Sequence, residues 1–201
     1  MWPTDAIYLP WDIWAVTWIA AALWSNRTLK RPGFQREWLY RLVTLAGFVL
    51  LFGLPLKVTS HGVRFLSFPG NLDRAFGYPP LIIGWIMVAV TALSFLFAWW
   101  ARIYLGRLWS GSITRKEGHH VVDTGPYRLV RHPIYTGIIF AGFATAIVVS
   151  TPRVYIGAVL VTIGYWMKAR IEERFLRAEL GAQAYDAYAA KTAMLVPFVK
   201  L

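Results

Sequence analysis

The stretch 80–101, PLIIGWIMVAVTALSFLFAWWA, decides the fold because it contains no charged residue over a length that can cross a bilayer as a helix. A transmembrane helix needs roughly 20 predominantly apolar residues. Similar apolar stretches lie near 6–24, 39–56, 134–149 and 154–167, and they leave no room for a separate water-soluble domain. We therefore expect an all-α, polytopic membrane helix bundle with about five transmembrane helices, followed by cytoplasmic C-terminal helices.

The composition agrees with this expectation. Hydrophobic residues make up 57% of the chain and charged residues only 15%, which excludes water-soluble enzymes, secreted modules and disordered tails. The chain contains no cysteine, so it forms no disulfide, thiolate zinc site, iron–sulfur site or cysteine nucleophile. We expect no metal site.

The net charge of +11 raises the alternative of a nucleic-acid partner, and the positions of the basic residues argue against it. In a five-span arrangement all Lys and Arg residues except Lys57, Arg64, Arg74 and Arg153 fall on one face. The positive-inside rule places that face in the cytoplasm, beside anionic lipids. We expect a multi-pass protein, in the inner membrane if the source is bacterial, with membrane lipids rather than nucleic acid as partners.

Two regions follow from the spacing of the apolar stretches. Residues 1–101 hold the N-terminal transmembrane helices, and the Asp5 and Asp12 carboxylates near the start argue against a cleaved signal. Residues 102–201 hold the long connector 102–133, two further spans, a helix running to Leu180 before Gly181, and a short helix over 182–191. The apolar stretches carry essentially no ionisable residue, which disfavours ion-coupled transport. We therefore expect an active site at the cytoplasmic interface.

The run 125–137, GPYRLVRHPIYTG, is the most distinctive motif in the chain. Pro133 suits the first turn of a helix, and a helix start flanked by Arg128 and Arg131 can hold an anion. A span that begins at a proline with interfacial arginines explains the same run equally well, and His132 alone is more typical of a satisfied interfacial histidine.

A second cluster, with Glu172 and Glu173 among Arg170, Arg174 and Arg177, lies on the continuation of the fifth apolar stretch. Surface ion pairs such as Glu173 with Arg177, four residues apart, account for it without any function. Its position on the same side as the run 125–137 favours a functional reading.

The two clusters together resemble the isoprenylcysteine carboxyl methyltransferase family over roughly 99–199, and the phospholipid N-methyltransferases more loosely. The residues that carry the resemblance are Trp109, His119, Gly125, Pro126, Tyr127, Arg128, Arg131, His132, Pro133, Tyr135, Gly137, Glu172, Glu173, Leu176, Gly181, Tyr185, Tyr188 and Pro197. The resemblance implies a membrane enzyme that uses S-adenosylmethionine. Neither a dinucleotide-binding nor a P-loop glycine motif occurs, so the cofactor pocket must be built from the membrane helices and their connectors.

The resemblance also implies roles for individual residues. The cofactor-binding residues are expected to be His119, Gly125, Tyr127, Arg131, His132, Pro133, Tyr135, Glu172 and Tyr185. Glu173, Arg128 and Arg170 are the expected catalytic residues, Glu173 placing the donor or acceptor and an arginine orienting the acceptor. Lys168 is an alternative to Arg170 as the basic residue before the acidic pair.

The methyl acceptor stays open at this stage. A carboxylate is ionised at neutral pH and needs only a cation to orient it, whereas an amine or thiol needs a proton acceptor such as His119, His132 or Glu173. The leading hypothesis is methylation of a carboxylate on a lipophilic, isoprenoid-like small molecule. The alternatives are a phospholipid or small-amine N-methyltransferase, a sterol-reductase-like membrane enzyme, and a non-catalytic membrane binding protein. The sequence leaves the oligomeric state unknown.

Overall fold

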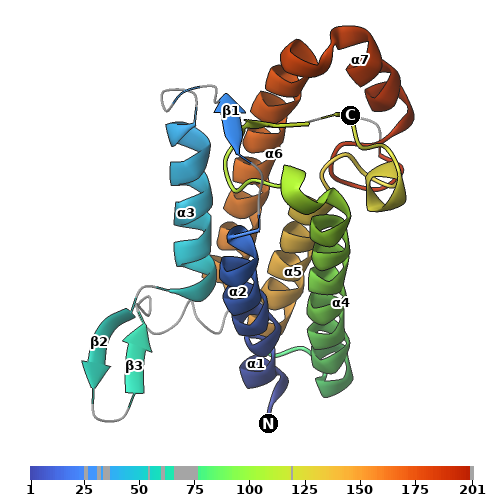
Figure 1. The fold of residues 1–201 in the computed structure, drawn as a ribbon. Coiled ribbons are helices and arrows are strands. Elements are labelled where there is room, and N and C mark those ends of the chain that lie inside the picture. The colour runs from blue at the N-terminus through green and yellow to red at the C-terminus, as the bar shows by residue number, and fades with distance from the viewer. Residues whose placement is uncertain are drawn as a thin grey trace.

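The computed structural model describes residues 1–24, 27–30, 33, 37–53, 55–59, 62–65, 77–118 and 120–199. His119, one of the expected cofactor residues, therefore lies outside the described residues. The described chain is mostly helical, which confirms the expected helical class (Figure 1). Its helices are α1 (Pro3–Ala6), α2 (Leu9–Ala22), α3 (Trp38–Phe52), α4 (Leu81–Leu105), α5 (Pro133–Val149), α6 (Pro152–Leu180) and α7 (Ala182–Lys191).

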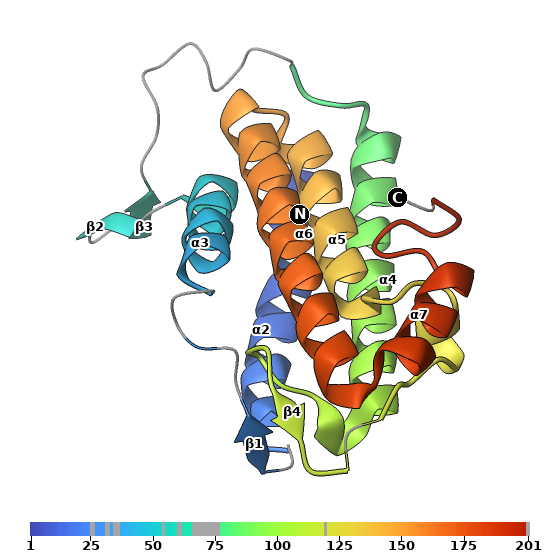
Figure 2. The same ribbon diagram turned by 90° about the horizontal axis from the view of Figure 1, so that it is seen from above.

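Each apolar stretch of the sequence forms a helix close to its expected bounds, and proline or glycine lies at several of the helix ends. Pro133 and Pro152 occupy the first positions of α5 and α6, where a missing backbone N–H costs nothing. Gly181 ends α6 with a φ of 101°, a conformation that residues with a Cβ rarely adopt. The chain can then restart as α7 in a new direction, which Figure 2 shows from above.

The helices pack as a bundle in which α3 lies along α6 and α4 lies along α5. Small residues permit the first contact: a methyl group on Gly47 of α3 would lie 2.6 Å from the backbone nitrogen of Val161 in α6. In the centre, Trp11 of α2 donates a hydrogen bond to Thr145 of α5 at 3.0 Å and contacts the ring of Phe95. The short helix α2 is thereby fixed to the bundle.

Within the described residues, two helical segments, Leu81–Leu108 and Pro152–Leu180, are long and apolar enough to cross a membrane. Trp38–Phe52 and Pro133–Val149 are shorter apolar helices. Large apolar side chains such as Ile19, Leu45 and Leu96 point outward and are exposed. A surface of this kind suits a bilayer better than water.

Two small antiparallel strand pairs were not expected from the sequence. One joins β2 (Pro55–Thr59) to β3 (Gly62–Phe65), and the other joins β1 (Thr28–Lys30) to β4 (Arg115–Lys116). The β1–β4 pair lies at the same end of the bundle as α7, opposite the N-terminus (Figure 1). It connects the N-terminal half of the chain to the segment between α4 and α5.

Candidate functional site

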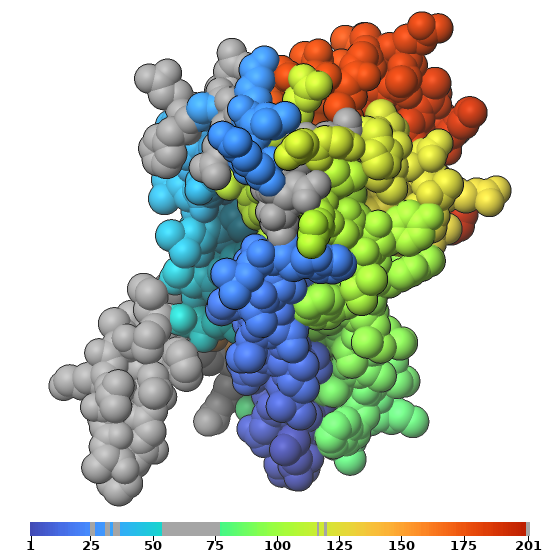
Figure 3. All heavy atoms as spheres, in the orientation of Figure 1, coloured from blue at the N-terminus to red at the C-terminus, as the bar shows by residue number. Residues whose placement is uncertain are grey.

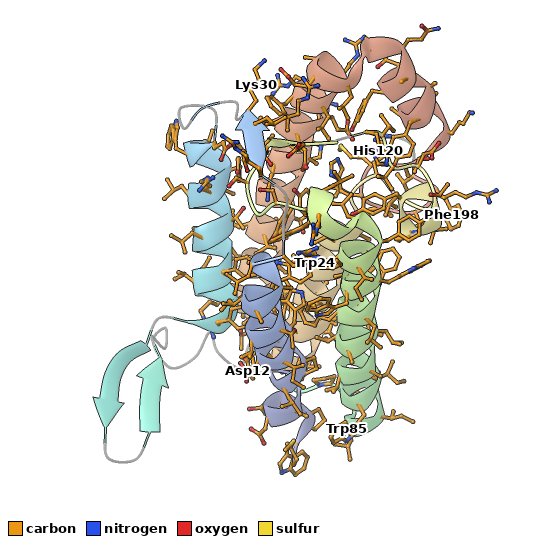
Figure 4. All side chains as sticks on the ribbon, in the orientation of Figure 1. Asp12, Trp24, Lys30, Trp85, His120 and Phe198 are labelled. Carbon is orange, nitrogen blue, oxygen red and sulfur yellow. The ribbon has the colours of Figure 1, made fainter. Side chains whose placement is uncertain are left out.

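A pocket opens at the α7 end of the bundle. Chain segments far apart in sequence line it: the end of α4 and the connector after it, the start of α5, the end of α6, and α7. Figure 3 shows α7 and the chain around residue 125 forming the surface at this end, and Figure 4 places Lys30 and His120 there, with Asp12 and Trp85 toward the other end. The lining residues are Leu105, Leu108, Trp109, Ser110, Ser112, Thr114, His120, Val121, Val122, Tyr127, Arg131, His132, Pro133, Ile134, Tyr135, Glu172, Leu176, Leu180, Tyr185 and Tyr188.

One side of the pocket is the connector 106–124, which we call the wall loop. It begins with a 3-10 turn at Gly106–Leu108 and includes β4. The Lys168 ammonium of α6 donates to its Gly111 carbonyl at 2.9 Å. Further along, Glu179 near the end of α6 pairs with both Lys30 of β1 and Arg115 of β4. The wall loop is therefore attached to α6 at two points.

Part of the pocket lining comes from the short 3-10 helix Gly125–Arg128. Gly125 has a φ of 58°, and a Cβ there would lie 2.6 Å from the Tyr104 ring, so its role is to shape the backbone. Tyr127 is buried and lines the pocket, and its carbonyl accepts a hydrogen bond of 2.7 Å from the Tyr188 hydroxyl of α7. The turn thus positions one aromatic side chain and holds α7 in place.

A charged cluster joins the start of α5 to α6. The Arg131 guanidinium donates to Glu173 through Nε at 2.6 Å and Nη2 at 3.3 Å, and His132 Nε2 lies 3.1 Å from the same carboxylate. Burial alone would raise the pKa of Glu173, but the hydrogen bonds and charges of His132 and Arg131 lower it to about 2. Glu173 lies beyond the apolar part of α6 and stays ionised at neutral pH as the partner of this cluster.

Glu172 has different surroundings from its neighbour. It lines the pocket, and its carboxylate accepts a hydrogen bond of 2.6 Å from the Tyr135 hydroxyl. The Tyr135 ring in turn stacks on His132, with centroids 5.2 Å apart. The two acidic residues therefore have different roles. Glu172 is the carboxylate that a ligand in the pocket would contact. Glu173 instead holds the Arg131 and His132 side chains in position.

The chain after α7 returns across the start of α5. The Ala193 and Met194 carbonyls accept hydrogen bonds from the backbone N–H groups of Arg131 and His132 at 2.8 and 3.1 Å. The Thr136 hydroxyl also donates to the Leu195 carbonyl at 2.7 Å. Two of the backbone donors near the expected anion site are consequently already satisfied by the protein.

The structure gathers most of the expected site residues and separates a few. Seven line the pocket: Tyr127, Arg131, His132, Pro133, Tyr135, Glu172 and Tyr185. Arg128 and Arg170 are exposed and are not among the lining residues, and the Arg170 guanidinium lies 5.9 Å from the Trp166 ring centroid. Helix spacing predicted an ion pair between Glu173 and Arg177. This prediction is wrong, because Arg177 pairs with Asp186 of α7 at 2.7 Å.

Sequence reasoning missed part of the lining. Leu180 could have been found, since Glu172, Leu176 and Leu180 are four residues apart and share one helix face. The wall-loop residues Ser110, Ser112, Thr114, His120, Val121 and Val122 carry no such signal, because an irregular segment has no periodicity.

Comparison with known proteins is consistent with this geometry. Residues 82–178 match the model of the isoprenylcysteine carboxyl methyltransferase (ICMT) family. The chain is 32% identical to protein-S-isoprenylcysteine O-methyltransferase B and 35% identical to protein-S-isoprenylcysteine O-methyltransferase A of Arabidopsis thaliana, each over 91 residues. A probable protein-S-isoprenylcysteine O-methyltransferase of Oryza sativa subsp. indica is 27% identical over 85 residues.

Each of these matches covers 42–43% of this chain and 44% of the relative, so less than half of each relative is represented. The matched part includes α4, the wall loop, α5 and almost all of α6. The part of the chain that carries most of the pocket, residues 82–178, is therefore similar to the isoprenylcysteine carboxyl methyltransferase family.

Proposed function

We propose that the chain is a multi-pass membrane methyltransferase that moves a methyl group from S-adenosylmethionine to a carboxylate of a lipophilic, isoprenoid-like molecule. The observation that carries the proposal is the meeting of Arg131, His132, Tyr135 and Glu172 in one pocket at the end of two membrane-capable helices. A pocket at the end of membrane-spanning helices can receive a soluble cofactor and a lipid-borne acceptor together. The charge distribution of the sequence supports a position of this pocket on the cytoplasmic face.

The pocket residues fit the chemistry of S-adenosylmethionine. The Glu172 carboxylate suits a cation, and the Tyr127 and Tyr185 rings supply aromatic surface. Thr114 lines the pocket and is 5% exposed, and its hydroxyl oxygen is buried without a hydrogen-bond partner among the described residues. Bound there, S-adenosylmethionine supplies a methyl group already activated by a sulfonium.

With an activated methyl group, the protein has to supply position and exclusion of water. Positioning of two reactants can contribute roughly 7–11 kcal/mol to lowering a barrier. The Tyr135 hydrogen bond orients the Glu172 carboxylate, and the Glu173 pairing fixes Arg131 and His132 beside it. Leu176 and Leu180 make the adjoining surface of α6 apolar. We therefore propose Glu172 as the residue that contacts the ligand and Glu173 as a positioning residue.

An amine acceptor is the second candidate, and the pocket offers specific support for it. Glu172 is the one acidic residue among the described lining residues, and a carboxylate attracts an amine. His120 lines the pocket, and its Nδ1 lies 3.0 Å from the Gly118 carbonyl, which can only accept, so in the neutral ring Nδ1 is the donor and Nε2 the acceptor. Arg131, in contrast, is already paired with Glu173.

The experiment that separates these functions uses purified protein, methyl-labelled S-adenosylmethionine and a lipid extract of the host. Carboxylate methylation predicts label that base releases as methanol, and N-methylation predicts base-stable label. Glu172→Gln should lower the rate at least tenfold, equivalent to about 1.4 kcal/mol of barrier. Absence of both transfer and S-adenosylhomocysteine binding would contradict a methyltransferase of either kind.

A further inference from the structure

The chain after α7 changes its surroundings halfway between residues 192 and 199. Residues 192–195 are buried, and their carbonyls accept hydrogen bonds from the start of α5. The last four described residues, which we call the apolar turn, are different. Three of them are exposed although they are apolar, namely Val196, Phe198 and Val199. A large apolar surface therefore leaves the protein directly after a segment that is fixed to it.

The apolar turn holds Phe198 in a backbone conformation that suits glycine. The Val199 N–H donates to the Val196 carbonyl at 3.1 Å, with Pro197 and Phe198 between them. Phe198 has a φ of 67°, and with proline before it this is the pattern of a type II turn, whose third residue is usually Gly or Asn. A positive φ is rare for a bulky residue, and such strain is concentrated at functional sites. Phe198 is 95% exposed, so packing within the described chain does not account for it.

The apolar turn lies beside the end of the helix bundle. The Leu195 carbonyl, just before the turn, accepts the hydroxyl of Thr136, which lies in the first turn of α5. Phe140 follows on the same face of α5, one turn deeper in the bundle, and is exposed. Figure 4 shows Phe198 at the flank of the molecule, at a level between His120 and Trp24. The turn is therefore continuous with the outward-facing apolar surface of the helices.

The neighbouring chain extends the apolar surface and adds a charge. Val130 forms a parallel β-bridge with Ala193, which brings the exposed Leu129 side chain close to the chain after α7. Arg128, next to Leu129 in sequence, is also exposed. Exposed apolar patches mark interaction sites, and a basic residue at the edge of such a patch suits anionic lipid headgroups. This combination favours the boundary of a bilayer.

We propose that the apolar turn is an interfacial anchor, in which Phe198 inserts between the lipids of the leaflet on the α7 side of the membrane. Insertion removes the ring from water, and this gain offsets the unfavourable backbone conformation. The anchor holds the chain after α7, and through it the backbone of Arg131 and His132, in place at the membrane surface. It depends on the membrane location of the bundle and not on the reaction.

Spin labels in this cysteine-free chain test the anchor. Phe198→Cys, Leu96→Cys and Asp186→Cys each receive one nitroxide label, in vesicles of phosphatidylcholine and phosphatidylglycerol. Collisions with oxygen report a lipid environment, and collisions with a water-soluble nickel chelate report water. The label at 198 should collide more with oxygen than with nickel, as should the label at Leu96 on the exposed face of α4. The label at Asp186, exposed on α7, should show the reverse.

Substitutions at Phe198 separate insertion of the ring from the geometry of the turn. The label is placed on Val199→Cys, so that residue 198 can be varied. Phe198→Asn suits the positive φ but lacks an apolar ring, whereas Phe198→Trp keeps an aromatic ring that suits the interface. Nickel collisions at 199 should rise roughly threefold or more in Phe198→Asn, because the gain from burying the ring is lost. They should stay unchanged in Phe198→Trp.

Each contrary result overturns a stated part of the proposal. Nickel access at 198 equal to that at 186 overturns the anchor. A label at 198 that is shielded from both oxygen and nickel shows that protein covers the turn, and overturns the contact with lipid. Equal access at 199 with Phe198 and with Asn at 198 overturns the role of the ring. Nickel access at Leu96 overturns the membrane location of α4 together with the anchor, and none of these results depends on methyl transfer.

Discussion

At the scale of single residues, Glu172 and Glu173 are neighbours in sequence with different surroundings. The Glu173 side chain is 15% exposed and pairs with an Arg131 side chain that is 9% exposed. Removing one partner of a largely buried pair leaves the other charge uncompensated, at a cost of about 3–5 kcal/mol. We expect Glu173→Gln to lower the free energy of unfolding by that amount in detergent, measured by chemical denaturation.

The pH dependence of this loss gives an independent check. Because the folded-state pKa of Glu173 is about 2 and its ordinary value is 4.5, its contribution is complete above pH 4.5 and declines as the pH falls toward 2. The difference in stability between wild type and Glu173→Gln should shrink over the same range. Asp186→Asn, in an exposed pair, is the control and should change stability little. Equal effects from both substitutions would contradict the buried cluster.

Gly125 lies in a motif expected to bind cofactor, yet its geometry indicates a backbone role. Its φ of 58° and the nearby Tyr104 ring both disfavour a Cβ. We expect Gly125→Ala to destabilise the protein by about 1 kcal/mol or more, through strain at the positive φ. Thermal unfolding measures this loss. Gly111→Ala, at a wall-loop glycine whose Cβ would have no atom closer than 3.8 Å, is the control, and equal stability of the two variants would refute the strain.

How much of the site could be predicted from the sequence depends on the sequence distance over which each contact forms. Tyr135 and Glu172 were expected at the same pocket, and the structure joins them by a hydrogen bond. The partner of Glu173 was not foreseen, because helix spacing points to Arg177 whereas the structure supplies Arg131 from a different helix. Short-range periodicity describes one helix face and carries no information about which helix packs against it.

At the scale of elements, the helices were largely predictable and the wall loop was not. Proline marks the starts of α5 and α6 within the sequence itself, and Gly181 marks the end of α6. The β1–β4 pairing joins residues far apart in sequence, as in Thr28 with Lys116, and depends on the packed bundle. This pairing and the Glu179 bridge hold one side of the pocket.

Glu179→Gln tests whether that bridge matters for ligand binding. The substitution removes the Glu179 charge, so Lys30 and Arg115 lose their common partner on α6. The wall loop should therefore open more often. We expect faster amide hydrogen exchange across 109–122 and roughly two- to threefold weaker S-adenosylhomocysteine binding in Glu179→Gln. High salt should change the wild type in a similar way, because it screens the same ion pairs.

Asp186→Asn is the matched control, because it breaks an exposed ion pair that does not contact the wall loop. Its exchange rates over 109–122 should equal those of the wild type. Unchanged exchange in Glu179→Gln would show that the backbone pairing alone holds the loop.

At the scale of the whole molecule, the placement of α7 and the wall loop at one end predicts their shared accessibility. Single cysteines at Arg107 and Lys191 in this cysteine-free chain should react with a membrane-impermeant reagent only from the cytoplasmic side. A cysteine at Tyr78, exposed before the start of α4, should react only from the opposite side. Labelling of all three from one side would refute the proposed orientation of α4.

We propose that the pocket between the wall loop, α6 and α7 binds the methyl donor, and calorimetric titration with S-adenosylhomocysteine measures that binding. Leu176→Trp places a bulky side chain into the lining, whereas Leu96→Trp places the same side chain on the exposed face of α4. We expect one binding site per chain in the wild type and in Leu96→Trp, and at least tenfold weaker binding in Leu176→Trp. Equal binding by folded Leu176→Trp, or no binding by the wild type, would contradict this proposal.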